Sequence, residues 1–162
     1  MLNLKINLTI CSGGQTGADR QALDWAISKS LPHGGWCPKG RIAEDGIIPA
    51  HYELRETSTA DYRQRTEQNV LDSDGTVIFT IAPTLESGTL LTAQFALASG
   101  KPCLHIHSGI QKPAQQLARF IRVKNIVRLN VAGSRASREP AVGALVQGVL
   151  DAALQILSAQ TT

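Results

Sequence analysis

The segment SGGQTGAD, Ser12–Asp19, separates two different patterns in the first thirty residues. Before it, Lys5–Cys11 forms a short apolar run that is typical of a buried strand. After it, Ala18–Ser30 repeats apolar residues at helical spacing, with Ala22, Leu23, Ala26 and Ile27 on one face. A strand, a glycine-rich turn and a helix in this order predict the first unit of a Rossmann-like sheet.

The composition of this turn is suited to binding an anion. Gly13, Gly14 and Gly17 allow positive φ angles and a close approach of the backbone, while Gln15 and Thr16 add an amide and a hydroxyl. The N–H groups at a helix start add partial positive charge. We therefore expect the turn to bind the phosphate of a nucleotide-like ligand. The alternative is a tight turn with no ligand, because the segment matches neither the Walker A nor the GxGxxG pattern.

The rest of the chain alternates strand-like and helix-like segments. Repeated β–α units predict an α/β, Rossmann-like three-layer domain, with a parallel sheet and helices on both faces. We expect one such domain over residues 1–162, with 31–60 as an ordered insertion loop. The further strands are predicted at Thr76–Ala82, Pro102–His107 and Asn125–Val131, and the further helices at Gly88–Ser99, Pro113–Arg122 and Val142–Leu157.

A second strand-to-helix turn, in LESGTLLT, follows the strand TVIFTIA. Ligands bind outside the carboxyl ends of parallel strands, so small polar groups there are candidates for binding. Ser87, Gly88, Thr89 and Thr92 would present such groups at a helix N-terminus. Simple helix capping by Ser87 explains this segment equally well when it is taken alone.

A third turn, in NVAGSRASREP, follows the strand predicted at Asn125–Val131. Gly133 and Ser134 form the turn, and Arg135 and Arg138 follow it. Arginine binds phosphate or carboxylate with two parallel hydrogen bonds. The alternative is a solvated basic loop.

Two further pairs of side chains are placed to contact an anion. Lys39 and Arg41 lie on a glycine-flanked loop that could close over a ligand. Arg65 and Asn69 lie four residues apart, so they share one helix face and could reach the same partner.

Composition narrows the class of function. The chain has 162 residues, a net charge of +3, and 43% hydrophobic residues, as in an ordinary globular protein. Residues 101–162 hold eight Lys or Arg against two acidic residues, but without interleaved aromatics, which favours a small anion over nucleic acid. The three cysteines of the chain are far apart in sequence, so we expect no disulfide framework. His105 and His107 lack a third ligand, so we expect no metal site.

The odd number and wide separation of the cysteines indicate a protein of a reducing compartment, and we expect it in the cytoplasm. The N-terminal segment lacks a basic leader with a small-residue cleavage site. We also expect no membrane-spanning helix, because no uninterrupted apolar stretch approaches 18 residues.

Several stretches together resemble the molybdenum cofactor carrier family. This family is a branch of a Rossmann-like superfamily that also holds the lysine-decarboxylase-like (LOG-type) phosphoribohydrolases. The matching stretches follow the family's order and cover nearly the whole chain: SGGQTGADRQALDWAI, GGWCPKGRIAEDG, YELRET, YRQRTEQNVLDSDGTVIF, SGTLLT and LNVAGSRASREP.

The resemblance implies a homo-oligomeric carrier without turnover. Such a protein would bind the molybdenum cofactor (molybdopterin with its metal and terminal phosphate), protect it, and hand it to molybdenum enzymes or an insertase. The predicted ligand-binding residues are Gly13, Gly14, Gln15, Thr16, Gly17, Lys39, Arg41, Arg65, Asn69, Ser87, Gly88, Thr89, Gly133, Ser134 and Arg135.

The alternatives are a nucleotide-processing enzyme and a sensor of a nucleotide-derived signal. The resembling hydrolases carry a catalytic glutamate in a PGGxGTxxE motif, but this chain has Thr92 at that position. A threonine cannot act as the carboxylate acid or base. Asp19, Glu44 or Asp45 would have to take that role, and the sequence shows no nucleophile paired with a base.

Overall fold

The computed structural model describes residues 6–159. Its centre is a five-stranded sheet in which every pair of neighbouring strands is parallel. In spatial order the strands are β2 (His33–Gly34), β1 (Thr9–Cys11), β9 (Arg128–Gly133), β7 (Gly75–Thr80) and β8 (Cys103–His107).

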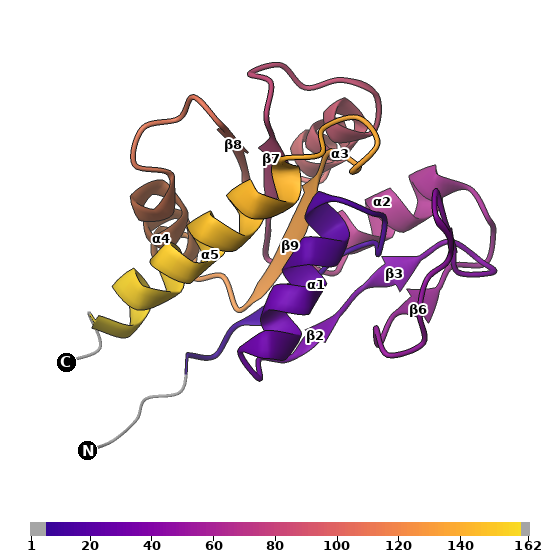
Figure 1. The fold of residues 1–162 in the computed structure, drawn as a ribbon, viewed down its shortest axis with the longest axis horizontal. Coiled ribbons are helices and arrows are strands. Elements are labelled where there is room, and N and C mark those ends of the chain that lie inside the picture. The colour runs from indigo at the N-terminus through magenta and orange to yellow at the C-terminus, as the bar shows by residue number, and fades with distance from the viewer. Residues whose placement is uncertain (1–5, 160–162) are drawn as a thin grey trace.

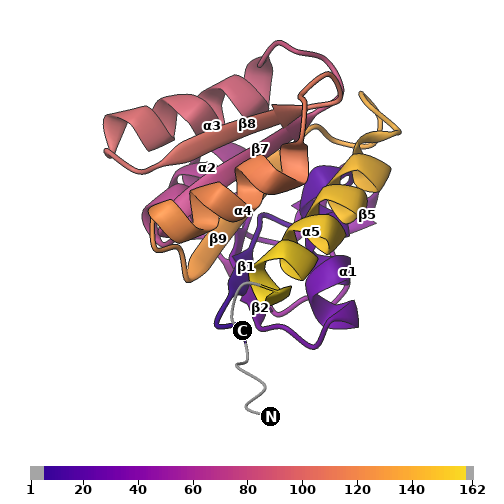
Figure 2. The same cartoon turned by 90° about the vertical axis from the view of Figure 1, so that its left-hand side faces the viewer.

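Helices cover both faces of this sheet (Figures 1 and 2). On one face α5 packs against both α1 and α4, while α2 and α3 pack together on the other. The predicted three-layer α/β arrangement is therefore confirmed. The helices are α1 (Ala18–Ser28), α2 (Tyr62–Leu71), α3 (Ser87–Ala98), α4 (Pro113–Val123) and α5 (Val142–Ala159).

The order of the strands departs from their order along the chain, because the last strand, β9, lies between β1 and β7. If numbering began at β9 and continued through β1, β2, β7 and β8, the spatial order would be 3-2-1-4-5, that of a Rossmann sheet. In such a sheet the ligand crevice opens where the order reverses. Here that point lies between the carboxyl ends of β9 and β7.

The two faces of the sheet differ in polarity. Ile10, Phe79 and Leu129 point into the main apolar core under α1, α4 and α5, and none of them is exposed. Successive residues of a strand point to opposite faces. Thr76 and Asn130 consequently face α2 and α3, and both are buried. The face under α2 and α3 therefore has a partly polar interior.

The segment predicted as an insertion loop is more ordered than expected. β2 belongs to the main sheet, so the insertion begins only at Gly35, which has a φ of +126° and no room for a Cβ beside the Ser12 backbone. It continues with two small sheets, around a second core that includes Cys37 and Ile48. These sheets pair β3 (Trp36–Cys37) with β6 (Arg55–Glu56), and β4 (Ile42–Ala43) with β5 (Gly46–Ile47).

Two details near the N-terminus differ from expectation. Lys5, where the first strand was predicted to begin, lies outside the described residues, and β1 begins only at Thr9. On α1, Ile27 is 41% exposed, whereas Trp25 is buried and its indole N–H donates to Asp151 of α5 at 2.9 Å. Packing of α1 against α5 as well as the sheet makes Trp25 part of the buried face.

The expectation that no helix could span a membrane was too strong. α5 has 18 residues with a mean hydropathy of 1.5, which is long and apolar enough by composition. Its Val142, Val146 and Leu150, however, are buried against the main core. Such a core helix meets the same criterion as a membrane helix, so α5 is weak evidence for a membrane span.

The close approach of α1 to the sheet predicts the effect of two matched substitutions. A Cβ at Gly133 would lie 2.2 Å from the Phe79 carbonyl oxygen and 2.6 Å from the Ala18 Cβ. We expect Gly133→Ala to lower the free energy of unfolding by about 1–3 kcal/mol. At Gly148, an exposed position of α5, a Cβ meets nothing within 4 Å, so Gly148→Ala should raise the free energy of unfolding by up to about 1 kcal/mol. Urea unfolding of both variants tests this, and equal effects would contradict it.

Candidate functional site

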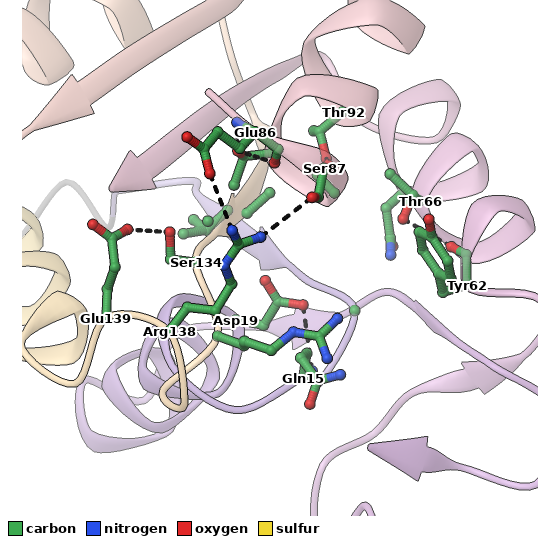
Figure 3. A pocket seen from close by; sticks show the side chains of 18 of the residues that line it. Gln15, Asp19, Tyr62, Thr66, Glu86, Ser87, Thr92, Ser134, Arg138 and Glu139 are labelled. Atoms are coloured by element: carbon green, nitrogen blue, oxygen red, sulfur yellow. Dashed lines mark hydrogen bonds and ion pairs between the residues drawn. The ribbon is translucent and has the colours of Figure 1, made fainter. Parts of the chain in front are cut away.

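A cavity of about 590 Å³ opens at the carboxyl ends of β9 and β7, the point where the strand order reverses (Figure 3). Its volume lies within the roughly 300–1,000 Å³ of small-molecule sites. All three predicted turns contribute to it, together with α2. The predicted residues that line it are Gly13, Gln15, Arg65, Asn69, Ser87, Gly88, Thr89, Gly133, Ser134 and Arg135.

The cavity also contains side chains that were not among the predicted binding residues. Tyr62 and Thr66 could have been found, because on the same helix Tyr62 is three residues from Arg65 and Thr66 is three residues from Asn69. Asn130 could have been found as a polar residue between two apolar ones in a strand. The remaining polar residues of the lining lie at the three turns or just beyond them, and they are Asp19, Thr84, Glu86, Thr92, Ser137, Arg138 and Glu139.

The first turn already surrounds an anion, which is the carboxylate of Asp19. Its Oδ2 accepts from the Gln15 backbone N–H at 3.3 Å and from Arg65 Nη1 at 2.9 Å. Gly13 makes this arrangement possible, because a Cβ there would lie 1.6 Å from Arg65 Nη1. The turn and Arg65 thus bind a side chain of the same motif.

The environment of Asp19 is unfavourable to its charge. Burial raises the pKa of this carboxyl above its ordinary value, and the opposing effects of Arg65 and of the Gln15 and Gly13 amides do not cancel the shift. The carboxylate and guanidinium are 7% and 14% exposed, so each depends on the other for compensation of its charge.

The third turn holds a second internal carboxylate. Glu139 Oε2 accepts from the backbone N–H groups of Ile81 and Ala82, at 2.9 and 2.7 Å, just beyond the end of β7. The hydroxyl of Ser134 donates to its other oxygen. Burial alone would raise the pKa of Glu139, but the hydrogen bonds from these three residues outweigh it and the pKa is lowered.

The second turn differs, because its helix-start amides have no acceptor. Among residues 6–159, neither the Ser87 N–H nor the Gly88 N–H donates a hydrogen bond. A Cβ at Gly88 would meet nothing within 4 Å. The Thr89 hydroxyl accepts from the Glu86 N–H and donates to the Glu86 carbonyl, which fixes the turn. The N-terminus of α3 is therefore the part of the cavity best prepared for an outside anion.

Arg138 joins the second and third turns across the cavity (Figure 3). Its guanidinium donates to Ser87 Oγ at 3.2 Å and to Glu86 Oε2 at 3.0 Å. Both charged side chains are about half or more exposed, so their pairing contributes little to stability. Arg138 can therefore exchange Glu86 for another anion at small cost.

Three predicted residues of the first turn lie outside the cavity lining. Gly14, with φ +78°, faces Ile48 and Leu54 of the second core, and a Cβ there would lie 2.7 Å from Leu54 Cδ1 and 3.0 Å from Ile48 Cδ1. Gly17 packs with φ +81° against the Ser134 carbonyl. Thr16 bonds to neighbouring loops instead: it donates to Glu44 and accepts from the Ala136 N–H. These residues shape the turn and connect it to neighbouring segments.

The predicted closing of Lys39 and Arg41 over a ligand would require their loop to move from its position in this structure. Neither side chain lines the cavity. The guanidinium of Arg41 is committed to its own loop, since it donates to four backbone carbonyl oxygens, those of Ile48, Pro49, Tyr52 and Leu54. Moving it toward an anion would break all four bonds.

Two of the three carboxylates considered as acid or base also lie outside the cavity lining. Hydrogen bonds from Ser137 and Thr16 lower the pKa of Glu44, and a bond from Arg20 lowers that of Asp45. Both groups are therefore held ionised and connect loops. Within residues 6–159 there is also no group of three His, Cys, Asp or Glu side chains that could hold a metal ion.

Comparison with known proteins agrees with this architecture. The family model of the circularly permutated YpsA SLOG family matches residues 10–154. The chain belongs to this family. The permutation in the family's description agrees with the strand order, in which β9 takes the place of a first Rossmann strand.

A solved structure extends the comparison over most of the chain. The chain is 46% identical to a protein from Syntrophus aciditrophicus SB described as a "putative molybdenum carrier protein". The match covers 90% of this chain and 94% of that one, with a TM-score of 0.87. The predicted resemblance to carrier proteins is thereby confirmed. No curated protein matches the chain.

The Asp19–Arg65 pair generates a prediction about stability. We expect Asp19→Asn and Arg65→Met each to lower the free energy of unfolding by about 3–5 kcal/mol, because each substitution leaves the other member of the pair as a buried charge without its partner. The double variant should lose clearly less than the sum of the two. Urea unfolding of the four proteins measures this coupling, and additive losses would show that the pair is not coupled. As a control, Glu86→Gln, at the exposed pair, should cost no more than about 1 kcal/mol.

The lowered pKa of Glu139 generates a prediction about pH. The ionised group stabilises the fold above its unfolded pKa of about 4.3, and this contribution is lost as pH falls through the lower, folded pKa. The Glu139→Gln variant should therefore be less stable than wild type at neutral pH, and the difference should shrink in acid. Unfolding free energies across a pH series measure it. Glu67→Gln, on the exposed side of α2, is the matched control, and the same profile in both variants would contradict the assignment.

Proposed function

We propose that this protein carries the molybdenum cofactor, a phosphate-bearing pterin, and binds it without turnover. The observation that carries the proposal is the N-terminus of α3, whose Ser87 and Gly88 amides lack acceptors among the described residues and face a cavity of about 590 Å³. This donor set suits a phosphate group. The printed name of the solved relative, a molybdenum carrier, supports the same ligand.

The charges around the cavity support a ligand anion at α3 rather than at the first turn. Binding at the first turn would require displacing Asp19, which is buried and paired with Arg65. At α3, the phosphate would accept from the amides of Ser87 and Gly88, and Arg138 would turn from Glu86 to the phosphate. The exposed Arg138–Glu86 pair costs little to break.

Three side chains that line the cavity and could be considered for catalysis are engaged in structural contacts, which favours binding over chemistry. The Thr92 hydroxyl, at the position of the related hydrolases' glutamate, donates to the Gly88 carbonyl. Asp19 is paired with Arg65, and Glu139 caps two backbone amides. Using Thr92, Asp19 or Glu139 as an acid or base for nucleotide cleavage would break one of these contacts first, so we place a nucleotide-processing enzyme second.

Carrier function implies further properties, which we include in the proposal. The protein would store the cofactor in the cytoplasm, as a homo-oligomer, and deliver it to molybdenum enzymes or an insertase. Cys11, Cys37 and Cys103 are all free thiols, and Cys103 is exposed, as expected in a reducing compartment.

A matched pair of variants at Gly88 tests the ligand site. Gly88→Asp places a negative charge at the α3 N-terminus, where the structure has space for a side chain and where an acidic residue favours the helix. The variant should fold like wild type but lose the ligand, while Gly88→Asn, similar in size and neutral, should retain much more of it. Molybdenum by elemental mass spectrometry and oxidised pterin by fluorescence, measured on proteins purified from the same cells, give the readout. Equal loading of the two variants, or a nucleotide in place of the pterin, would refute the carrier proposal.

A further inference from the structure

The inner wall of the cavity contains a buried hydrogen-bond acceptor without a donor. Asn130, on β9, is 2% exposed and lines the cavity. Its Nδ2 donates to Thr76 Oγ1 at 3.2 Å, but its Oδ1 has no partner among the described residues. Buried polar atoms are nearly always paired in native proteins, so an orphaned oxygen in a cavity wall requires an explanation.

The neighbouring side chains do not supply the missing donor. In the sheet register Asn130 lies between Cys11 and Thr76. Burial raises the pKa of Cys11, which leaves a neutral thiol, a weak donor that forms no hydrogen bond with Asn130 Oδ1. Asn69, across the cavity on α2, uses both ends of its amide on the backbone of Trp36. The acceptor is therefore left for a group that enters the cavity.

A buried hydrogen-bond donor without an acceptor belongs to another residue that lines the same cavity. Arg65 Nε is buried and has no acceptor among residues 6–159, although Nη1 of the same guanidinium bonds to Asp19. Gly13 and Asp19 fix this guanidinium in place, so its Nε–H cannot easily turn elsewhere. Two residues that line the cavity thus carry one unpaired acceptor and one unpaired donor.

We propose that these two groups recognise a heterocycle that carries a lactam, an N–H beside a carbonyl. The ring N–H donates to Asn130 Oδ1, and an acceptor of the ring takes the Arg65 Nε–H. Pterins and guanine-type purines carry this group, whereas adenine does not. The inference rests on the proposed function, because it places the ring inward from a phosphate bound at the N-terminus of α3.

Three phosphorylated probes separate the ring from the phosphate. Inosine 5′-monophosphate carries the lactam, its N1-methyl derivative has a methyl group in place of the N–H donor, and ribose 5-phosphate has no heterocyclic base. By calorimetry on the wild-type protein, we expect the first to bind at least about tenfold more tightly than the second, because methylation leaves Asn130 Oδ1 unpaired. Equal affinities for these two probes, or tighter binding of adenosine 5′-monophosphate, would overturn the proposal.

Substitutions at Asn130 provide an independent test. Asn130→Leu should abolish the preference for the lactam and leave ribose 5-phosphate binding unchanged, whereas Asn130→Asp, which keeps an acceptor, should retain it. The Leu variant removes an unpaired oxygen but also the hydrogen bond from Nδ2 to Thr76, and these effects oppose each other, so the melting temperature should change little. A lower melting temperature with unchanged lactam preference would assign Asn130 a purely structural role.

The two proposals fail in different ways. If Gly88→Asp does not weaken the binding of ribose 5-phosphate, the phosphate site at α3 is wrong, and the lactam inference fails with it. If that variant does weaken binding while methylation of the lactam has no effect, the phosphate site stands and only the role of Asn130 and Arg65 is refuted.

Discussion

The ion pair between Arg65 and Asp19 is the contact on which the ligand-facing side of this protein depends. It joins α2 to the start of α1 across the first turn, and it forms only because residue 13 has no side chain. Its two charges are nearly removed from water, so neither can move without a large desolvation penalty. The pair therefore fixes one wall of the cavity and excludes the first turn as the place where a ligand's phosphate would bind at low cost.

The same principle applies at the third turn, where Glu139 holds the amides that follow β7. Amide groups at the ends of strands and helices need acceptors when they are buried, and a carboxylate from the same chain can supply them. Carboxylates of the chain thus satisfy an amide of the first turn and two amides that follow β7, whereas the Ser87 and Gly88 amides of the second turn are left without an acceptor among the described residues. A site for an external anion thus follows from which amides the chain leaves unpaired rather than from the number of glycines.

Sequence patterns were sufficient for the fold class, because alternating strands and helices of ordinary length dictate a parallel sheet. They could not reveal β2, which has two residues and no periodicity, nor the position of β9 between β1 and β7, which depends on contacts between distant segments. The convergence of the three turns was predictable from the rule that ligands bind at the carboxyl ends of parallel strands. The pairing of Glu139 with amides 57 and 58 residues away, and of Arg41 with its own loop, required the tertiary structure.

The unequal faces of the sheet explain why the polar groups gather where they do. Under α1, α4 and α5 the strands contribute Ile10, Phe79 and Leu129 to the main apolar core, and this side supplies most of the hydrophobic stabilisation. The face under α2 and α3 can then carry buried polar residues such as Thr76 and Asn130, which add little to stability by themselves. Proteins commonly depart from good packing at functional sites and compensate elsewhere. Because the orphaned atoms of Arg65 and Asn130 both lie on this polar side, a ligand that satisfied them would gain binding energy and also remove a local cost of the fold.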